Sequence, residues 1–193
     1  MPPRFDAAAL QRLRAIVRDR PALAIDAPEH RRACVLIAII EDGDGYGVLF
    51  SRRSQNLAAH SGQIAFPGGA VEEGESLEAA ALRESEEEVG IPASRVEIIG
   101  RLDDLITNSG FLVAPFVGLI AGKIDYILQA SEVDEVFEVP MERLLAEGQP
   151  EVRYVDFLSK RYPVYYYHSD HHEIWGMTGR ILKGFLDLVW RAL

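Results

Sequence analysis

Residues 69–91, GAVEEGESLEAAALRESEEEVGI, combine a composition typical of a helix with a dense set of carboxylates. Ala, Leu and Glu dominate positions 76–89, which contain neither proline nor glycine. Alanine and side chains without a branch at Cβ favour a helix. Gly90 suits the position just past a helix end, because glycine adopts the left-handed backbone conformation found there without strain. The sequence therefore predicts a helix that ends at Gly90.

Three glutamates of this predicted helix recur at helical spacing. Glu84, Glu87 and Glu88 stand at i, i+3 and i+4, so we expect three carboxylates on one face with Cβ atoms roughly 5–6 Å apart. Leu82 and Val89 fall on nearly the opposite side, which we expect to pack against the core. Like charges this close destabilise an isolated helix by roughly 0.2–0.5 kcal/mol per pair, so a cation is expected among them. Mg²⁺ or Mn²⁺, which prefer carboxylate oxygens, are the predicted ions.

The residues before the helix carry a second set of signals. Five residues separate Gly69 from Glu75, and seven separate Glu75 from Arg83. We expect Glu75 and Arg83 to form an ion pair that braces the loop against the helix. Pro67 begins a Pro-Gly-Gly run, typical of a tight turn where the backbone can approach a ligand or turn a carbonyl toward a metal. Glu86 points away from the other glutamates of the helix, so we interpret it as a solvated side chain.

Residues 69–91 resemble the Nudix box, whose pattern is Gx5Ex7REUxEExGU with U an apolar residue. The resemblance implies an α/β fold of the Nudix type, an α/β/α sandwich with a mixed β-sheet. It also implies hydrolysis of a nucleoside diphosphate that is linked to another moiety. In this family the glutamates that match Glu84, Glu87 and Glu88 bind divalent metal, and the carbonyl that matches Gly69 joins them.

The identity of the general base differs among members of this family. We predict Glu84 as the base and Glu84 with Glu87 as the catalytic residues, and we keep Glu132 and Glu135 of a later acidic stretch as alternatives. Ser85 stands where the box has an apolar residue. Its hydroxyl can bond back to a helical carbonyl, so we expect this departure to do little harm.

A second motif lies directly upstream. Residues 49–69, LFSRRSQNLAAHSGQIAFPGG, resemble the accessory motif of the coenzyme A pyrophosphatase branch, LLTxRSxxLRxHxGExxFPGG. Ala58 stands where an arginine is usual, and Gln63 where a glutamate is common. Residues 173–182, EIWGMTGRIL, resemble the segment that opens the final helix in the same branch. The positions of the accessory motif that match are Leu49, Arg53, Ser54, Leu57, His60, Gly62, Phe66, Pro67, Gly68 and Gly69.

This second resemblance implies that the substrate is coenzyme A or a derivative, cleaved to 3′,5′-ADP and 4′-phosphopantetheine or its acyl form. The phosphates of such a substrate need cations besides the metal. Arg53 is the first candidate and Arg52 the second, because the guanidinium fork can donate two parallel hydrogen bonds to a phosphate. Gly68 is predicted to let the backbone approach the substrate. His60 either contacts the substrate or fixes its own loop by a hydrogen bond.

Two other functions stay open at this point. Ala58 breaks the accessory pattern, which leaves ADP-ribose, NADH or a dinucleoside polyphosphate as alternative substrates of the same chemistry. The other alternative is a nucleotide-binding module that has lost turnover. Intact Glu84, Glu87 and Glu88 argue against that alternative, because a pure binder has no need for three clustered acids that cost stability.

The length and composition of the chain limit the number of domains and the kinds of partner to be expected. A chain of 193 residues with 48% hydrophobic content fits one domain over residues 1–193, with a helical extension at 1–25 and a final helix at 178–192. A net charge of −10 disfavours nucleic acid and anionic membranes as partners. It would also repel an anionic small-molecule substrate, which makes bound metal and local arginines more necessary. The N-terminus has no apolar signal segment, and the longest apolar run, residues 33–40, is too short to span a bilayer, so we expect a cytoplasmic protein. A homodimer is one assembly that the sequence allows.

Hydrophobic periodicity predicts the remaining elements. A leading helix is expected at residues 6–19 and a short one at 141–147. Strands are expected at residues 34–40, 47–50, 96–106, 111–120, 132–140, 152–157 and 163–167.

Three further groups of residues have both a functional and a structural interpretation. Cys34, the one cysteine, is predicted to be a packed core residue rather than a nucleophile. The cluster of His168, Asp170, His171 and His172 favours a polar surface turn over a zinc site, because its members are adjacent in sequence. Aromatic side chains near the C-terminus can stack on adenine or line a channel, but they are better explained as strand and core residues; these are Tyr165, Tyr166, Tyr167 and Trp175.

Overall fold

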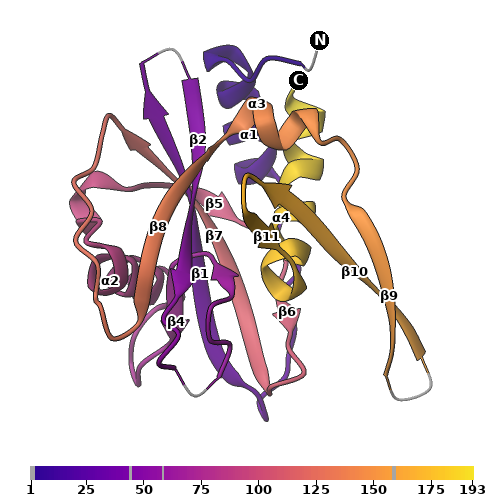
Figure 1. The fold of residues 1–193 in the computed structure, drawn as a ribbon. Coiled ribbons are helices and arrows are strands. Elements are labelled where there is room, and N and C mark those ends of the chain that lie inside the picture. The colour runs from indigo at the N-terminus through magenta and orange to yellow at the C-terminus, as the bar shows by residue number, and fades with distance from the viewer. Residues whose placement is uncertain (1–2, 44, 58, 158–159) are drawn as a thin grey trace.

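A mixed β-sheet runs through the middle of the molecule with helices on both sides (Figure 1). The computed structural model describes residues 3–43, 45–57, 59–157 and 160–193. The strands run in the order β3-β2-β1-β7-β5, with β8 paired to β2, β4 to β1 and β6 to β7. Their bounds are β1 Arg31–Asp42, β2 Gly45–Arg53, β3 Ile64–Ala65, β4 Gly68–Ala70, β5 Glu97–Arg101, β6 Leu105–Ile106, β7 Phe111–Ala121 and β8 Val133–Pro140.

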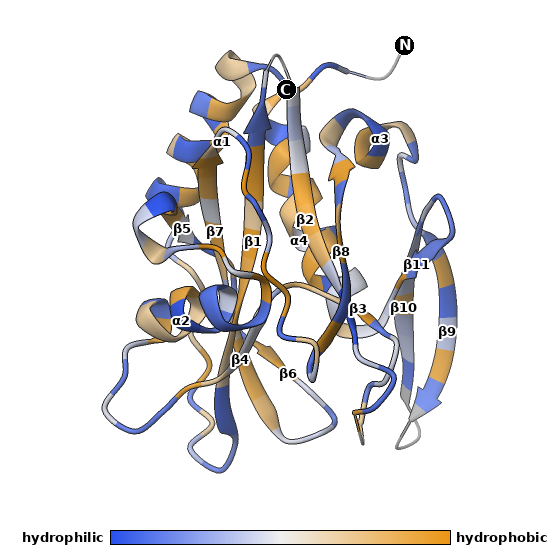
Figure 2. Cartoon of the chain, turned by 60° about the vertical axis from the view of Figure 1, so that its left-hand side comes forward, coloured by the Kyte–Doolittle hydropathy of each residue, from blue (hydrophilic) through white to orange (hydrophobic). Residues whose placement is uncertain are grey.

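The two central strands, β1 and β7, pair in parallel along their whole length, and the other pairs of this sheet are antiparallel. Successive residues of β1 point to opposite faces, as the pleat of a strand requires. Ile37 and Ile39 enter one core, while Leu36, Ala38 and Ile40 enter the other. Because both faces of β1 are covered, the strand is apolar in its central part, residues 33–40, as Figure 2 shows by its colour.

Helix α2 (Leu77–Val89) covers one face of the sheet, and α1 (Ala7–Asp19) and α4 (Gly176–Ala192) cover the other. Leu10, Leu13 and Val17 of α1 are buried in the core that α4 also enters. The predicted α/β/α sandwich with a mixed sheet is therefore confirmed. Within the described ranges, no helix is long and apolar enough to cross a membrane.

A smaller three-stranded antiparallel sheet stands beside the main one. It consists of β9 (Glu151–Phe157), β10 (Lys160–Ser169) and β11 (His172–Ile174), and β10 lies in the middle. The short helix α3 (Met141–Ala146) connects β8 to β9, and the β9–β10 hairpin extends away from the body of the molecule (Figure 1).

Most predicted elements lie where the sequence placed them, with small shifts at their ends. The final helix, expected at 178–192, begins at Gly176, and the leading helix begins at Ala7. The expected strand at 96–106 is wrong as a single element, because β5 ends at Arg101 and β6 begins at Leu105. Its two parts still pair with the same strand, β7.

The helix predicted from residues 76–89 is confirmed. The Ser76 hydroxyl accepts a hydrogen bond from the Ala79 N–H at 3.1 Å and caps the N-terminus of α2. Gly90 ends the helix in the left-handed region, with a φ of 74°. The expected packing of Leu82 is wrong, since this side chain is only half-buried. Smaller side chains pack against the sheet in its place, namely Ala80, Ala81, Ser85 and Val89.

Candidate active site

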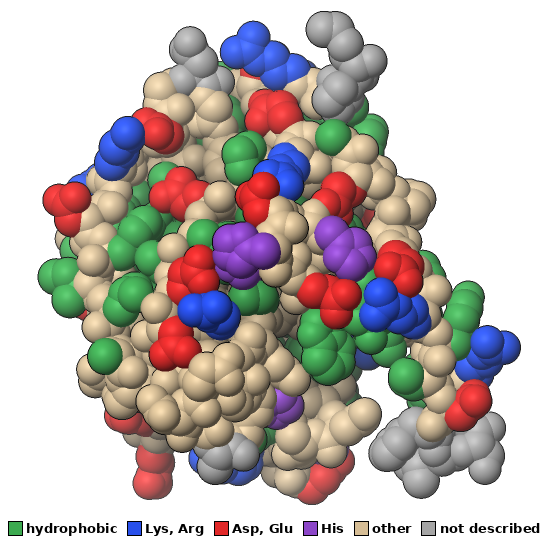
Figure 3. Space-filling view, viewed as in Figure 1, with side chains coloured by type: hydrophobic (Ala, Val, Ile, Leu, Met, Phe, Trp, Pro, Cys, Tyr) green, Lys and Arg blue, Asp and Glu red, His purple; other side chains and the backbone are tan. Residues whose placement is uncertain are grey.

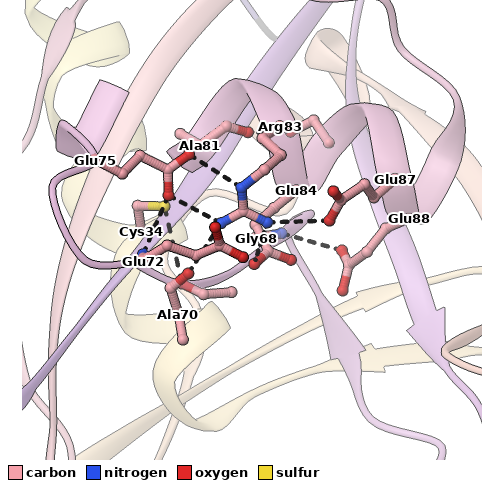
Figure 4. Close-up of polar contacts among 12 residues, drawn as sticks. Cys34, Gly68, Ala70, Glu72, Glu75, Ala81, Arg83, Glu84, Glu87 and Glu88 are labelled. Carbon is pink, nitrogen blue, oxygen red and sulfur yellow. Dashed lines mark hydrogen bonds and ion pairs between the residues drawn. The ribbon is translucent and has the colours of Figure 1, made fainter. Parts of the chain in front are cut away.

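Arg83, in the middle of α2, ties the helix to the loop before it (Figure 4). Its guanidinium donates two hydrogen bonds to the Glu75 carboxylate, each of 3.0 Å, and one of 3.1 Å to the Ala70 carbonyl. The predicted Glu75–Arg83 pair is thus confirmed. The same guanidinium also donates to Glu84 and Glu87, both at 3.0 Å. In this protein Arg83 neutralises part of the acidic cluster as well as bracing the loop.

Glu88 lies deeper than the other two glutamates of the cluster. The whole residue is 4% exposed, and its carboxylate accepts a hydrogen bond of 3.0 Å from the Gly68 N–H. Burial raises the pKa of Glu88 to about 7, even though the Gly68 N–H and the Arg53 charge favour its ionised form. The Arg53 guanidinium stays 3.9 Å from the carboxylate, beyond hydrogen-bond distance. The buried carboxylate is therefore short of positive charge.

Two glycines let the β4 backbone come close to its neighbours. Gly68 has a φ of +154°, and a Cβ on it would collide with the Cys34 carbonyl oxygen and the Val35 Cα across the β1–β4 pair. A Cβ on Gly69 would lie 2.5 Å from the carboxylate atoms of Glu84. The Pro-Gly-Gly run thus creates the space into which Glu84 and Glu88 project.

Cys34 packs beneath this turn as a core residue, as predicted. Its side chain is fully buried, and the thiol donates a long hydrogen bond of 3.8 Å to the Gly69 carbonyl. Burial raises the pKa of the thiol to about 11. The thiol is therefore protonated at neutral pH, which argues against a role as a nucleophile.

The three predicted metal ligands differ in exposure along one face of α2. The side chains of Glu84, Glu87 and Glu88 are 16%, 59% and 6% exposed, respectively. Burial also raises the pKa of Glu84, against the opposing effect of Arg83. All the proposed ligand atoms are oxygens. The carboxylates of Glu84 and Glu88 are largely buried, and no arginine neutralises either of them completely. Such a set fits a hard divalent cation such as Mg²⁺ or Mn²⁺.

The two candidate arginines of β2 have different partners. Arg53 projects toward α2 and Glu88, whereas the Arg52 guanidinium lies 3.3 Å from the Glu135 carboxylate of β8. The pairing register between β2 and β8 shifts between Arg52 and Arg53. Of the two alternative bases, Glu132 lies near enough to Glu84 and Glu88 for its charge to raise the pKa of both. Glu135 instead faces Arg52.

His60 fixes its own loop in this structure. The side chain is exposed, and its Nδ1 lies 3.0 Å from the side-chain oxygen of Gln63. The backbone at His60 has a φ of 57°, so the residue stands in a left-handed turn. Of the two roles that the sequence left open, this contact favours the loop-fixing one. Ala58, the main departure from the accessory motif, lies outside the described residues.

The predicted polar turn near the C-terminus is partly wrong. His168, Asp170 and His171 are exposed, as expected, but the His172 side chain is only 8% exposed. The reason is that β11 turns the His172 ring inward, where it stacks on Phe137 of β8 with ring centroids 3.8 Å apart. His171 belongs to the exposed turn, whereas His172 begins β11, so sequence adjacency does not imply equal exposure.

The aromatic residues near this turn differ in burial. Tyr167 is buried in the main core, in agreement with its structural interpretation. Tyr166 stacks on Trp175 with ring centroids 5.9 Å apart, and Trp175 is 40% exposed.

Sequence reasoning missed three features of the site: the bridging of Glu84 and Glu87 by Arg83, the burial of Glu88, and the approach of Arg53 to Glu88. The bridging by Arg83 could have been predicted in part, because Arg83 and Glu87 are four residues apart on a helix. The burial of Glu88 is less evident from the sequence, although Glu88 stands three residues after Ser85, on the border of the buried face of the helix. The third depends on strand pairing and has no local signal.

The chain is similar in sequence to known proteins. A family model described as the NUDIX domain matches residues 30–158. The uncharacterized Nudix hydrolase NudL of Escherichia fergusonii is 39% identical over 165 residues, which cover 85% of each protein. NudL of Shigella boydii matches with the same identity and coverage.

Solved structures share the fold. A MutT/nudix family protein from Enterococcus faecalis superimposes with a TM-score of 0.55 at 15% identity, covering 95% of this chain and 75% of that one. RenU, a Nudix hydrolase from M. smegmatis, gives a TM-score of 0.52 at 21% identity over 60% of this chain and 73% of its own. The domain match and the NudL relatives together settle the family. The chain belongs to the Nudix hydrolases, metal-using enzymes that cleave pyrophosphate bonds in nucleoside diphosphate derivatives.

Proposed function

We propose that this enzyme hydrolyses the pyrophosphate bond of coenzyme A, its thioesters or its oxidised forms, and releases 3′,5′-ADP and the corresponding 4′-phosphopantetheine. The observation that carries the proposal is the accessory motif at residues 49–69, which runs without interruption into the Nudix box. Its arginine, Arg53, lies beside the buried carboxylate of Glu88. A guanidinium in that position supports binding of a phosphate next to the acidic cluster.

The residues proposed to hold the metal are Glu84, Glu87, Glu88 and the Gly69 carbonyl. A divalent ion bound there would neutralise the pyrophosphate and lower the pKa of a coordinated water.

Glu84 is proposed as the general base. A water oxygen attacks one phosphorus, the bond from that phosphorus to the bridging oxygen breaks, and Glu84 takes the proton of the water. A carboxylate has two oxygens, so that one can bind the ion while the other accepts the proton. Gly69 is proposed to let this carboxylate lie against the backbone at the start of the site. Arg53 first, and Arg52 second, are proposed to hold the phosphates, and Gly68 to let the backbone approach them.

A test is product analysis by chromatography with coenzyme A and ADP-ribose as substrates, in Mg²⁺ or Mn²⁺. We expect the native enzyme to release 3′,5′-ADP from coenzyme A and to cleave ADP-ribose more slowly. Glu88→Gln should lose turnover. Glu86→Gln is the matched control, because Glu86 is an exposed glutamate of the same helix and should keep the native rate.

The alternative within the same chemistry is a substrate such as ADP-ribose, NADH or a dinucleoside polyphosphate. The observation that favours it is Ala58, which replaces a usual arginine of the accessory motif. Faster cleavage of ADP-ribose than of coenzyme A would support this alternative and reject the coenzyme A proposal. A non-catalytic binding module would bind nucleotide and turn over neither substrate.

A further inference from the structure

A second cluster of possible metal ligands lies outside the acidic helix, where the β10–β11 turn meets β8. Glu135 of β8, His171 of the turn and His172 of β11 bring three ligand atoms within 4.8 Å of one another. The Glu135 Oε1 lies 3.3 Å from the His172 Nε2 and 4.0 Å from the His171 Nε2. Both imidazoles therefore turn the same nitrogen toward one carboxylate oxygen. Figure 3 shows this face of the molecule, where histidine side chains border acidic and basic ones.

His172, the most buried residue of this cluster, has a ring nitrogen without a hydrogen-bond partner among the described residues. The His172 ring is 8% exposed and lies flat on Phe137, with an angle of 4° between the rings. Its Nε2 is buried and makes no hydrogen bond to any residue that the structure describes. The Glu135 oxygen is near this nitrogen but badly aligned for a hydrogen bond. Buried polar atoms are nearly always partnered, so this nitrogen, which lies 3.3 Å from the Glu135 oxygen without a hydrogen bond, leaves room for a ligand.

We propose that Glu135, His171 and His172 form a second metal site that binds Zn²⁺ or a similar imidazole-seeking transition ion. Two imidazoles and one carboxylate suit zinc, whereas Mg²⁺ prefers oxygen ligands. Ligands at 2.0–2.1 Å around a tetrahedral ion stand about 3.3–3.4 Å apart. Glu135 and His172 are already at that separation. The His171 side chain, 74% exposed, has the freedom to close the remaining gap.

Arg52 orients the carboxylate of this site. Its guanidinium lies 3.3 Å from the Glu135 Oε2, which leaves Oε1 turned to the histidines. An outer partner of this kind fixes the direction of a metal-binding carboxylate. Three protein ligands also leave one coordination position for water or another small ligand, as in zinc sites that are not closed.

The second site is separate from the α2 carboxylates. Phe137, on which His172 stacks, packs against the core that contains α1 and α4, whereas α2 packs against the other core. The neighbouring arginines of β2 follow the same division, since Arg53 faces Glu88 and Arg52 faces Glu135. A metal at the second site would tie β8 to the β10–β11 hairpin, two segments that lie far apart in the sequence.

The test is a Zn²⁺ titration of the full chain against a chromophoric chelator, with Co²⁺ absorption as a second readout. To remove the α2 ligands, the titration uses the Glu84→Gln/Glu88→Gln background. We expect one Zn²⁺ per chain to remain, and Co²⁺ to give the intense visible bands of a low-coordinate site with nitrogen ligands. His171→Ala or Glu135→Gln should weaken Zn²⁺ binding at least as much as the roughly 10–100-fold that loss of an outer partner costs.

His168→Ala is the matched control, because His168 is an exposed histidine of the same hairpin that pairs with Glu151 instead. It should keep the native Zn²⁺ affinity. His171→Ala leaves the core untouched, so a folding defect does not complicate its result. Equal Zn²⁺ affinity in His171→Ala, Glu135→Gln and His168→Ala would overturn the proposal. Loss of Zn²⁺ binding in the Glu84→Gln/Glu88→Gln background would overturn it too.

Discussion

At the residue scale, burial of the Glu88 carboxylate affects the stability of the folded protein. Its carboxylate has a pKa of about 7 in the folded protein, against an ordinary value of 4.5. The folded state therefore binds more protons than the unfolded state between these two values. The unfolding free energy of the metal-free protein therefore falls as the pH rises from 4.5 to about 7. Above about pH 7, the buried Glu88 carboxylate is ionised and lowers stability the most.

Glu88→Gln removes this buried charge. We expect the metal-free variant to be more stable than the native protein by about 1–3 kcal/mol near pH 8, and the difference to shrink toward about pH 5. Urea unfolding in the presence of a chelator measures both values. A variant that is less stable than the native protein near pH 8 would contradict the burial argument.

A second prediction concerns the close approach of Gly69 to the Glu84 carboxylate. Its φ is not in the positive range, so alanine suits the backbone, but the new Cβ would press on the Glu84 carboxylate at 2.5 Å. We expect Gly69→Ala to fold and to lose turnover by about 10²-fold, the effect of displacing a catalytic group by about 1 Å.

Gly68→Ala serves as the comparison. It adds a Cβ that collides with the β1 backbone, at a φ that side chains rarely adopt. The expected result is a large loss of folding stability, measured by thermal unfolding. If Gly69→Ala kept the native rate, the close approach of Glu84 to the glycine turn would be irrelevant to catalysis.

At the element scale, Gly90 ends α2 and also admits a neighbouring segment. A Cβ at Gly90 would lie 2.8 Å from the Ile127 backbone nitrogen. Gly74 precedes the helix, also with a positive φ, but has open space around it. We expect Gly74→Ala to cost about 1–2 kcal/mol of unfolding free energy from backbone strain alone. Gly90→Ala should cost more than Gly74→Ala, and equal losses in chemical denaturation would show that Ile127 moves aside freely.

Ser85 provides another prediction for α2. The side chain is fully buried, and its hydroxyl donates a hydrogen bond of 2.7 Å to the Ala81 carbonyl, as the sequence led us to expect. Ser85→Ala should change the unfolding free energy by less than about 1 kcal/mol, because it removes only one hydrogen bond within the helix, from the Ser85 hydroxyl to the Ala81 carbonyl. Ser85→Leu should cost about 1–3 kcal/mol by overpacking. Urea denaturation of the two variants distinguishes them, and a stabilising Ser85→Leu would reveal unfilled space beneath the helix.

At the scale of the whole molecule, we propose that residues 1–193 fold as one domain. Leu13 of α1 is fully buried in the core shared with α4. Leu13→Ala should lower the unfolding free energy by about 2–5 kcal/mol in a single transition, seen alike by circular dichroism and tryptophan fluorescence. Gln11→Ala, on the exposed side of α1, is the control. A separate early transition in circular dichroism would mean that α1 unfolds independently of the sheet.

The sequence by itself determined the features that depend on neighbours in the chain. The extent of α2, its ends at Ser76 and Gly90, and the Glu75–Arg83 brace all follow from local propensity and short spacings. The fold class followed from the family resemblance, which the domain match and the solved structures bear out.

Only the tertiary structure decided which of these side chains are buried and which distant residues meet. Glu88 is buried because β4 pairs with β1 and turns the Gly68 N–H toward it. Arg52 and Arg53 are adjacent in β2 and project to opposite faces, so Arg52 meets its cross-strand partner Glu135 while Arg53 approaches Glu88. Spacing along one helix is set by the helical repeat alone. Strand register, by contrast, depends on packing across the whole sheet, which no short stretch of sequence contains.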